Sequence, residues 1–329
     1  MELPTNYRQV HTEAFLQTWT KLNAEQRQAA EQMEGPMLVL AGPGTGKTQV
    51  LAARIGNILL QTDYLPENIL CLTFTDAGSI AMRDRLIQFI GPAAHRVHIF
   101  TFHSFCNAVI QSNLPLFGQH GMEPLTELER IDLIRSLIDE LSPDHPLYRT
   151  HTYSYSYEKQ LHQLFTLMSK ENWTSDYVVE IGEQWIQSLP DNPDFKYKVA
   201  TKTNKRGDVN QRKTEEETER AEKLIAAARL FARYQEKKKN LRRYDYEDMI
   251  LWVLHAFNNH PYLLRNYQER YQFILVDEYQ DTNNAQNEIL LQLLNYWDTP
   301  NVFAVGDDDQ SIYEFQGARL FTLTEFVRR

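Results

Sequence analysis

The sequence predicts an α/β protein whose parallel sheet has helices on both faces and is interrupted by a mostly helical insertion. Short, continuous apolar runs alternate with helical patterns towards both ends of the chain, a glycine-rich turn joins the first run to the first helix, and the middle of the chain lacks clear buried strands. With 329 residues, 42% of them hydrophobic, the chain is long enough for two domains or for one domain with a large insertion.

Five apolar runs are the candidate strands of this sheet. They are continuous rather than alternating, which is typical of strands covered on both faces in a parallel sheet. The runs cover residues 37–41, 69–74, 97–102, 273–276 and 302–305. Between the first two runs, residues 49–61 carry apolar side chains at helical spacing. The resulting order of strand, loop, helix and strand is typical of a doubly wound α/β domain.

The central part of the chain is expected to form a separate, inserted subdomain. Amphipathic patterns at residues 128–141 and 218–239 predict helices there. We therefore expect one domain built from residues 1–106 and 240–329, and a helical subdomain at residues 107–239.

Two features of the insertion leave alternatives open. Residues 196–217 carry basic side chains ahead of an acidic run, which favours a solvated, mobile loop, with contact to duplex DNA as the alternative. A tyrosine cluster could stack bases, but packing or a polar loop is the simpler interpretation. The cluster consists of Tyr148, Tyr153, Tyr155 and Tyr157.

Composition restricts the classes of partner and cofactor. The formal charge of -10 and the pI near 5.5 argue against coating by nucleic acid through bulk charge, so any such contact must be local. Cys71 and Cys106 are too few and too far apart for a disulfide framework, a zinc ribbon or an iron–sulfur cluster. No apolar run is long enough to span a bilayer, so a cytoplasmic protein is expected.

The glycine-rich turn is a candidate phosphate-binding loop. It reads AGPGTGKT at residues 41–48, between a strand and a helix, where glycines let backbone N–H groups point at phosphate oxygens. Lys47 would reach the β- and γ-phosphates, and the Thr48 hydroxyl would bind Mg²⁺. The alternative is a glycine-rich turn with a surface lysine. The loop residues expected to bind the nucleotide are Gly42, Pro43, Gly44, Thr45, Gly46, Lys47 and Thr48.

Acidic residues follow a later strand and supply a second half for this site. Asp277 stands at the carboxyl end of the run 273–276, where ligands bind in open α/β sheets, and can hold Mg²⁺ through water. Glu278 is then placed to orient and deprotonate an attacking water. Gln310, after the run 302–305, could sense the γ-phosphate. A solvated acidic turn and an ordinary polar loop residue are the respective alternatives.

The order of these motifs resembles the superfamily-one DNA helicases of the UvrD, Rep and PcrA type. The similarity extends from Leu22 to Ala318, which is nearly the whole chain. It includes LNAEQRQAA at 22–30, AGPGTGKT at 41–48, LTFTDAGSIAMRDRL at 72–86, TFHSFC at 101–106, YDYEDMI at 244–250, VDEYQDTN at 276–283 and VGDDDQSIYEFQGA at 305–318. The resemblance implies a RecA-like sheet that binds ATP and Mg²⁺.

The resemblance also implies roles for individual residues. Gln26 would read the adenine edge, and Gln49 would lie near the nucleotide. Aromatic rings would stack on the bases of single-stranded DNA, which tolerates any sequence. The implied stacking residues are Phe74, Tyr313 and Phe315, and the implied backbone-contacting residues are Thr75, Thr101 and His103. Core packing is the alternative for Phe74 and Phe102, and a buried structural histidine is the alternative for His103.

Several positions depart from the commonest family pattern. Gln49 stands where many relatives have arginine, which puts that nucleotide contact in doubt. Asp76 replaces a usual asparagine, and its carboxylate would repel a phosphate backbone. Phe315 and Gln316 replace a usual tryptophan and arginine, so a charge-assisted link between the nucleotide and DNA sites is missing.

The resemblance implies the ATP-binding N-terminal portion of a helicase or translocase that moves 3′ to 5′ on single-stranded DNA and meets single-strand/duplex junctions. The alternative is a non-motor module that binds ATP and DNA as a switch; a small-molecule kinase is a third reading, for which no acceptor pocket is evident. Because the chain ends 12 residues after Gly317, the second motor domain with its arginine fingers is expected to be missing. The chain would then bind Mg-ATP but hydrolyse it slowly and not unwind duplex DNA.

Overall fold

The computed structural model describes residues 15–118, 121–150, 153–200 and 204–307. The chain divides into two compact units, unit 1 with residues 1–118 and 247–329, and unit 2 with residues 119–246. Both divisions lie later in the sequence than the expected 106/107 and 239/240. A helix of unit 1 runs through residue 106, and a short strand at residues 243–244 pairs within unit 2.

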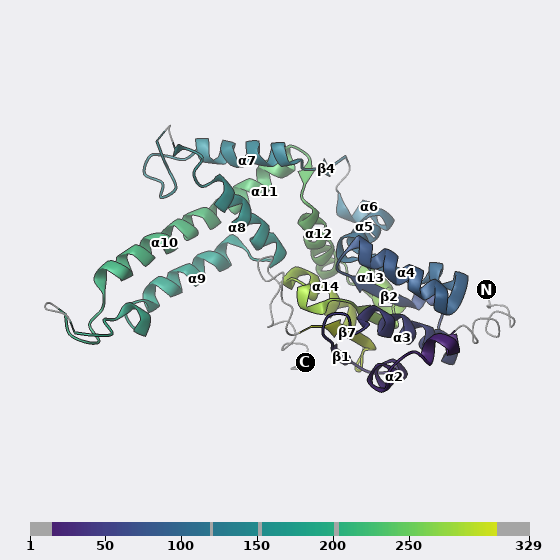
Figure 1. Ribbon diagram of the computed structural model, residues 1–329. Helices are drawn as coiled ribbons and strands as arrows, with labels where there is room; N and C mark the ends of the chain where they lie inside the picture. Colours follow the sequence, from purple (N-terminus) through teal and green to yellow (C-terminus); the bar gives the residue numbers. More distant parts are fainter. Residues whose placement is uncertain (1–14, 119–120, 151–152, 201–203, 308–329) are drawn as a thin grey trace. The chain divides into compact units, whose positions relative to one another are not determined.

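Unit 1 contains a five-stranded parallel sheet in the order β1-β7-β6-β2-β3 (Figure 1). The strands are β1 (Met37–Leu40), β2 (Ile69–Thr73), β3 (His98–Thr101), β6 (Phe273–Val276) and β7 (Val302–Gly306). All five coincide with predicted apolar runs to within a residue or two. The predicted α/β class with a parallel sheet is therefore confirmed.

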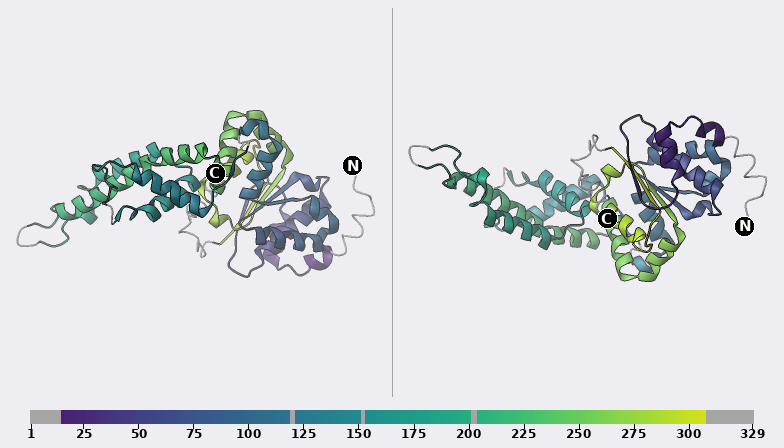
Figure 2. Two further views of the ribbon diagram at one scale, coloured as in Figure 1. Left: turned by 90° about the horizontal axis from the view of Figure 1, so that it is seen from above. Right: turned by 90° about the horizontal axis from the view of Figure 1, so that it is seen from below.

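The helices of unit 1 cover both faces of this sheet. They are α2 (Ala24–Glu31), α3 (Lys47–Gln61), α4 (Asp76–Ile90), α5 (Phe102–Ser112), α6 (Leu114–Phe117), α12 (Tyr246–Asn259), α13 (Pro261–Arg270) and α14 (Asn284–Leu294), with 3-10 turns η1 (Pro66–Asn68), η2 (Gly91–Arg96) and η5 (Tyr279–Asp281). Figure 2 shows the sheet close to edge-on, with the purple and most of the blue helices on one side and the green helices on the other.

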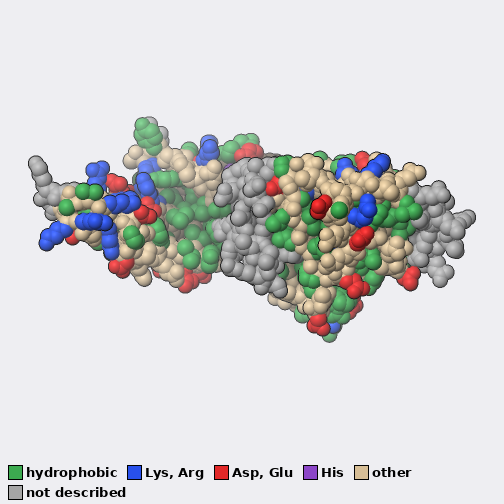
Figure 3. Space-filling view, turned by 60° about the horizontal axis from the view of Figure 1, so that its bottom comes forward, with side chains coloured by type: hydrophobic (Ala, Val, Ile, Leu, Met, Phe, Trp, Pro, Cys, Tyr) green, Lys and Arg blue, Asp and Glu red, His purple; other side chains and the backbone are tan. Residues whose placement is uncertain are grey.

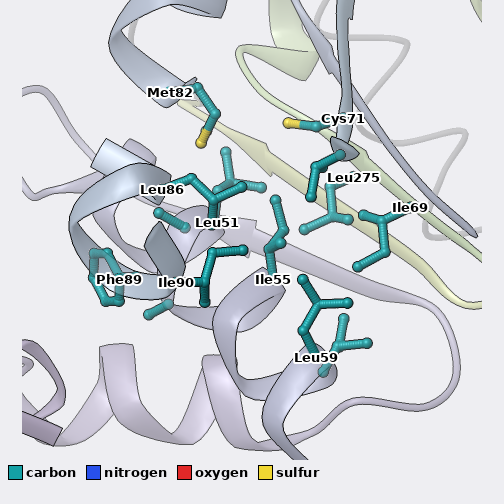
Figure 4. Packing of buried hydrophobic residues seen from close by; sticks show 14 of the residues in the cluster. Leu51, Ile55, Leu59, Ile69, Cys71, Met82, Leu86, Phe89, Ile90 and Leu275 are labelled. Atoms are coloured by element: carbon teal, nitrogen blue, oxygen red, sulfur yellow. The ribbon is translucent and has the colours of Figure 1, made fainter. Parts of the chain in front are cut away.

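The main core of unit 1 lies between the sheet and helices α3 and α4. Alternate strand residues point to this face, so Cys71 of β2 and Leu275 of β6, which are register partners, both belong to the cluster. Figure 4 shows them facing Leu51 and Ile55 of α3 and Leu86 of α4. This packing fixes the start of α3, and hence the glycine-rich turn, against the carboxyl ends of the strands.

Strand β1 differs from the expectation that every strand is covered on both faces. It lies at the edge of the sheet and pairs only with β7 among the described strands. Leu40 at its end is 54% exposed within the described residues. A continuous apolar run therefore did not by itself distinguish an edge strand from a central one.

Unit 2 is mostly helical and has its own core. Its elements are β4 (Glu123–Pro124), α7 (Glu127–Asp139), α8 (Glu158–Lys170), α9 (Ser175–Ser188), η4 (Pro193–Phe195), α10 (Gln211–Arg229), α11 (Phe231–Asn240) and β5 (Arg243–Tyr244). Leu137, Phe165 and Tyr234 belong to its apolar cluster. Strands β4 and β5, near the two ends of the unit, pair in parallel.

The predicted loop at residues 196–217 is wrong in its second part, because α10 begins at Gln211, where Asn210 caps it. Lys196 also pairs with Val209 as an isolated antiparallel bridge. Lys and Arg side chains gather with acidic ones at the end of the helix pair where α9 ends and α10 begins (Figure 3). Arg212, for example, contacts Glu216 at 3.0 Å. This pairing favours the solvated interpretation of the basic run.

An ionic cluster in unit 2 surrounds the buried Lys238 and the partly buried Asp245. Asp245 accepts hydrogen bonds from Lys238 at 2.8 Å, Arg130 at 3.0 Å and Tyr234 at 3.1 Å. Burial by itself raises the pKa of Asp245, but Lys238 and Arg130 outweigh it and hold that pKa below its ordinary value. Asp245 thus joins α7 and α11 to the segment that follows β5.

Replacing Asp245 with asparagine is expected to destabilise the protein by about 3 kcal/mol near neutral pH, because Lys238 would remain buried without its carboxylate. The folded-state pKa is depressed, so this stability is present above the unfolded pKa of about 3.9 and is lost as pH falls through the folded value. Urea unfolding of both proteins between neutral pH and pH 3 should show a difference that is constant above about pH 5 and narrows below about pH 4. A Glu216→Gln control should show no measurable change, and a pH-independent Asp245 effect would contradict the assignment.

None of the helices in the described ranges combines the length and apolar character needed to cross a bilayer.

Candidate functional site

Because all five strands are parallel, their carboxyl ends meet at one edge of the sheet, and most of the described candidate residues lie at or just after those ends, whereas Gln26 lies on α2 before β1. The glycine-rich loop follows β1, Asp307 follows β7, and Asp277 follows β6. Phe74 follows β2, and His103 follows β3. The strand order therefore places the nucleotide candidates over β1, β7 and β6 and the DNA candidates over β2 and β3. Gln310, Tyr313 and Phe315 lie outside the described residues.

The glycine-rich loop has the backbone that phosphate binding requires. Gly44 and Gly46 have φ values of 72° and 86°, a left-handed conformation that favours glycine. Gly46 is the N-cap of α3, and no side chain caps the helix there. The first N–H groups of α3 are therefore available to an anion at the positive end of the helix dipole. Within the loop, the Thr45 hydroxyl donates to the Gly42 carbonyl at 2.7 Å.

Gln26 lies against this loop. Its Nε2 donates to the carbonyl of Thr45 at 2.7 Å, while its Oε1 accepts from the backbone N–H of Asn23 in the capping box of α2. A Cβ added at Gly46 would come within 3.0 Å of Gln26 Nε2. The structure thus places Gln26 beside the nucleotide loop, and its role in reading adenine stays a prediction. Gln49 lies in the first turn of α3, where its N–H donates to the Gly46 carbonyl.

Lys47 joins the loop to the acidic residues that follow β6 and β7. Its Nζ lies 3.0 Å from Glu278 Oε2 and 3.9 Å from Asp307 Oδ2. The Glu278 side chain is 38% exposed, whereas that of Asp307 is 1% exposed. These contacts bring the two halves of the predicted site together around the ammonium group of Lys47. A bound triphosphate would replace the carboxylates as the partner of that group.

The acidic residues near Lys47 carry more negative charge than one lysine neutralises. Burial, and then the charge of Glu278, raises the pKa of Asp277 to about 6, although the Glu278 N–H and Lys47 act in the opposite direction. The pKa of Asp281 is raised to about 6 by the same two causes in the same order. A site with this excess of carboxylates favours a bound cation.

The residues present fit Mg²⁺ when phosphate completes the coordination. Across the described ranges, no group of three or more His, Cys, Asp and Glu side chains is placed to hold a metal by itself. Mg²⁺ at nucleotide sites, however, typically takes one or two protein oxygens together with phosphates and water. Thr48 at the start of α3 and Asp277 at the end of β6 offer a hydroxyl and a carboxylate, which is such a donor set.

On the β2 and β3 side, two of the DNA candidates have structural roles that the sequence reading missed. Thr75 caps α4 by accepting from Gly78 N–H at 3.0 Å, and Thr101 caps α5 through a reciprocal pair with Ser104. Thr101 is also buried. The Thr-x-x-Ser spacing could have indicated a helix start at Thr101. Thr75 remains exposed, so capping does not remove it from a surface that could meet DNA.

The remaining candidates on this side differ in burial. Phe74 and His103 are half-buried, whereas Phe102 is buried in the core, in agreement with the packing alternative for Phe102. Asp76 is exposed in the first turn of α4, where the helix dipole stabilises a carboxylate. This gives Asp76 a structural reason that is independent of DNA.

Comparison with known proteins matches residues 22–329 to the UvrD/REP helicase N-terminal domain. The chain belongs to this family. Similar family members include the ATP-dependent DNA helicase PcrA of Bacillus subtilis, 29% identical over 93% of this chain and 35% of the relative, and DNA helicase II of Rickettsia typhi, 31% identical over 93% and 40%. PcrA of Staphylococcus aureus is 26% identical over 93% and 36%. The chain thus spans little more than a third of the length of these relatives.

Two residues near the site of this UvrD/REP domain, Arg54 and Gln280, were not predicted from the sequence. Arg54 of α3 is 1% exposed and donates to the carbonyls of Ala29, Gln32 and Met33 at the end of α2, and burial lowers its pKa to about 10. The position of Arg54 among the apolar residues of the helical pattern could have indicated that its side chain is buried. Gln280 contacts Glu278, and only the fold shows that contact.

Proposed function

We propose that this chain is the ATP-binding N-terminal portion of a DNA helicase or translocase, which couples hydrolysis of Mg-ATP to 3′ to 5′ movement on single-stranded DNA in DNA repair, replication or recombination. The observation that carries the proposal is the 3.0 Å contact between Lys47 and Glu278. It joins the phosphate loop and the acidic motif at the same sheet edge that carries the DNA candidates. The ATP-dependent DNA helicases among its relatives support the same function.

The proposed chemistry is hydrolysis of the γ-phosphate. Lys47 leaves Glu278 to bind the β- and γ-phosphates, and the first N–H groups of α3 bind phosphate oxygens. Thr48 and Asp277 would hold Mg²⁺, which would supply charge neutralisation when bound. Glu278 takes a proton from water as the water oxygen bonds to the γ-phosphorus, and the bond from that phosphorus to the bridging oxygen breaks, giving ADP and phosphate.

Coupling to DNA follows from the shared edge of the sheet. Bases would stack on Phe74 and, in the segment beyond the described residues, on Tyr313 and Phe315. Thr75, Thr101 and His103 would contact the strand. Because β6, which precedes Glu278, pairs with β2, which precedes Phe74, a change at the phosphate site can shift the DNA side by a short path.

The proposal is tested by titrating a fluorescent ATP analogue with Mg²⁺ in the presence and absence of oligo-dT. Coupled sites should change each other's affinity by the same factor, about fivefold or more, and DNA affinity should fall with added salt. A single-strand/duplex junction should bind at least as well as oligo-dT. ATP binding that ignores DNA would favour a switch module or another ATP-binding function, and the absence of ATP binding would refute the proposal.

A further inference from the structure

We propose that Gln280 is a positioning residue that orients Glu278 for attack by water, an inference that rests on the proposed ATP hydrolysis. Gln280 is 2% exposed and lies in η5, directly after the acidic motif. Its Nε2 donates to Glu278 Oε2 at 2.7 Å, and its Oε1 accepts from the backbone N–H of Asp307 at 3.0 Å. One amide therefore connects Glu278 to the end of β7.

The hydrogen-bond partners determine which way this amide faces. The Asp307 N–H can only donate, so it requires the amide oxygen. The carboxylates of Glu278 and Asp281 can only accept when ionised, so they require the amide nitrogen, whose second contact is Asp281 Oδ2 at 3.4 Å. A flipped amide would place oxygen against carboxylate and NH₂ against N–H. Gln280 thus presents a fixed donor to Glu278, and its other end is anchored on the backbone of the sheet.

Glu278 needs such a restraint because its backbone is in a sparsely populated conformation. Its φ of 49° and ψ of 47° lie in the left-handed region, which is unfavourable for a residue with a Cβ. Conformations of this kind persist where surrounding contacts over-determine them, and they concentrate at functional sites. Around Glu278 those contacts include the Asp277 carboxylate, which accepts from its N–H, the Asp281 N–H, which donates to its carbonyl at 2.9 Å, and the side chains of Lys47 and Gln280.

Lys47 and Gln280 contact the same oxygen of Glu278, but only the Lys47 contact is expected to break when nucleotide binds. Lys47 and Gln280 both contact Oε2, while Oε1 accepts no hydrogen bond from the part of the chain that the structure describes. When Lys47 turns to the phosphates, Gln280 keeps its hold on Oε2. Oε1 on the partly exposed side chain is then the oxygen that takes the proton from water. Gln280 therefore sets the direction of the base without touching the substrate.

The experiment compares single-turnover ATP hydrolysis and binding of a fluorescent ATP analogue in the whole chain and two variants. Gln280→Met removes both hydrogen bonds, and Gln280→Glu keeps an acceptor for the Asp307 N–H but puts a carboxylate against Glu278. Both should hydrolyse bound ATP about 10- to 100-fold more slowly, while ATP affinity stays within about threefold. Gln280→Glu keeps the test valid if Gln280→Met fails to fold.

Gln268→Met is the matched control. Gln268 is also buried, and its Nε2 donates to the Gln292 carbonyl at 2.7 Å, away from the nucleotide site. This variant should lose stability, because it breaks the same kind of hydrogen bond. It should still hydrolyse ATP within about twofold of wild type, because that bond lies away from the nucleotide site. Adding Gln280→Met to Glu278→Gln should cause no further loss, because Gln280 acts only through Glu278.

Three results would overturn the inference. They are hydrolysis by the Gln280 variants at the wild-type rate, an equal loss of ATP affinity and hydrolysis rate, and an additive loss in the double variant. If the wild-type chain and the Gln280 variants hydrolyse ATP at the same rate, only the role of Gln280 is contradicted. A wild type that binds no ATP contradicts the proposed function as well.

Discussion

Replacing Lys47 with alanine should lower the affinity for Mg-ATP by about 100-fold. Hydrogen bonds to charged groups contribute about 1.5–3 kcal/mol each, and the ammonium group can reach two phosphates, so a loss near 3 kcal/mol is expected. The structure shows that the side chain is already held beside the phosphate loop by Glu278 at 3.0 Å. The lysine is thus pre-positioned, and little ordering cost offsets its contribution to binding.

The measurement is a titration of a fluorescent ATP analogue with Mg²⁺, with and without oligo-dT. Lys21→Ala, which removes an exposed lysine just before α2, is the charge-matched control and should bind like wild type. Because Lys47→Ala leaves the buried Asp307 without that cation, thermal unfolding must show that the variant is folded. Nucleotide affinity within about threefold of wild type would remove Lys47 from the site.

Replacing Glu278 with glutamine should separate ATP binding from hydrolysis. Loss of a general base typically costs 10² to 10⁴ in rate, so single-turnover hydrolysis should fall by at least about 100-fold. ATP affinity should stay the same or increase, because one negative charge is removed from beside the triphosphate. The variant side chain remains long enough to meet both Lys47 and Gln280 through its amide oxygen, so the local fold is expected to survive.

Glu288→Gln provides the control for this variant. Glu288 lies on α14, where it accepts from Asn284 at 2.9 Å, so the Glu288→Gln variant removes one carboxylate of unit 1 that is not a partner of Lys47. It should leave both ATP affinity and hydrolysis unchanged. If Glu278→Gln hydrolysed ATP at the rate of this control, another group would have to activate the water, and the assignment of Glu278 as base would be wrong.

Local sequence patterns were sufficient to predict the five strands of the main sheet and the glycine-rich turn before α3. The apolar runs at 69–74 and 273–276 form strands, in agreement with the expectation that short, continuous apolar runs are typical of strands covered on both faces of a parallel sheet. Gly44 and Gly46 indicated a phosphate loop, because glycines between a strand and a helix can adopt the left-handed backbone conformation that such a loop requires. Capping at Thr101 is equally local, because Thr101 and Ser104 satisfy each other within one helical turn.

Other features could not be predicted from the sequence because they depend on which strands become neighbours. The exposure of Leu40 follows from β1 lying at the sheet edge. Gln280 meets the Asp307 N–H because β6 and β7 pair, and nothing in the sequence near either residue indicates that pairing. Helix α10 begins at Gln211, earlier than its polar first turns suggested, because Asn210 caps it and α9 packs along it.

Taken alone, the sequence predicted the α/β class, which the structure confirms, and named the phosphate loop, Lys47 and Glu278 as candidates for one site, because the apolar runs and the two short motifs are each local patterns. The tertiary structure decided that β7 lies between β1 and β6, which brings the carboxylate of Glu278 to the ammonium of Lys47 and a buried amide to that carboxylate. Strand order results from long-range packing of apolar faces, and a short stretch of sequence contains no information about which distant strand will cover it.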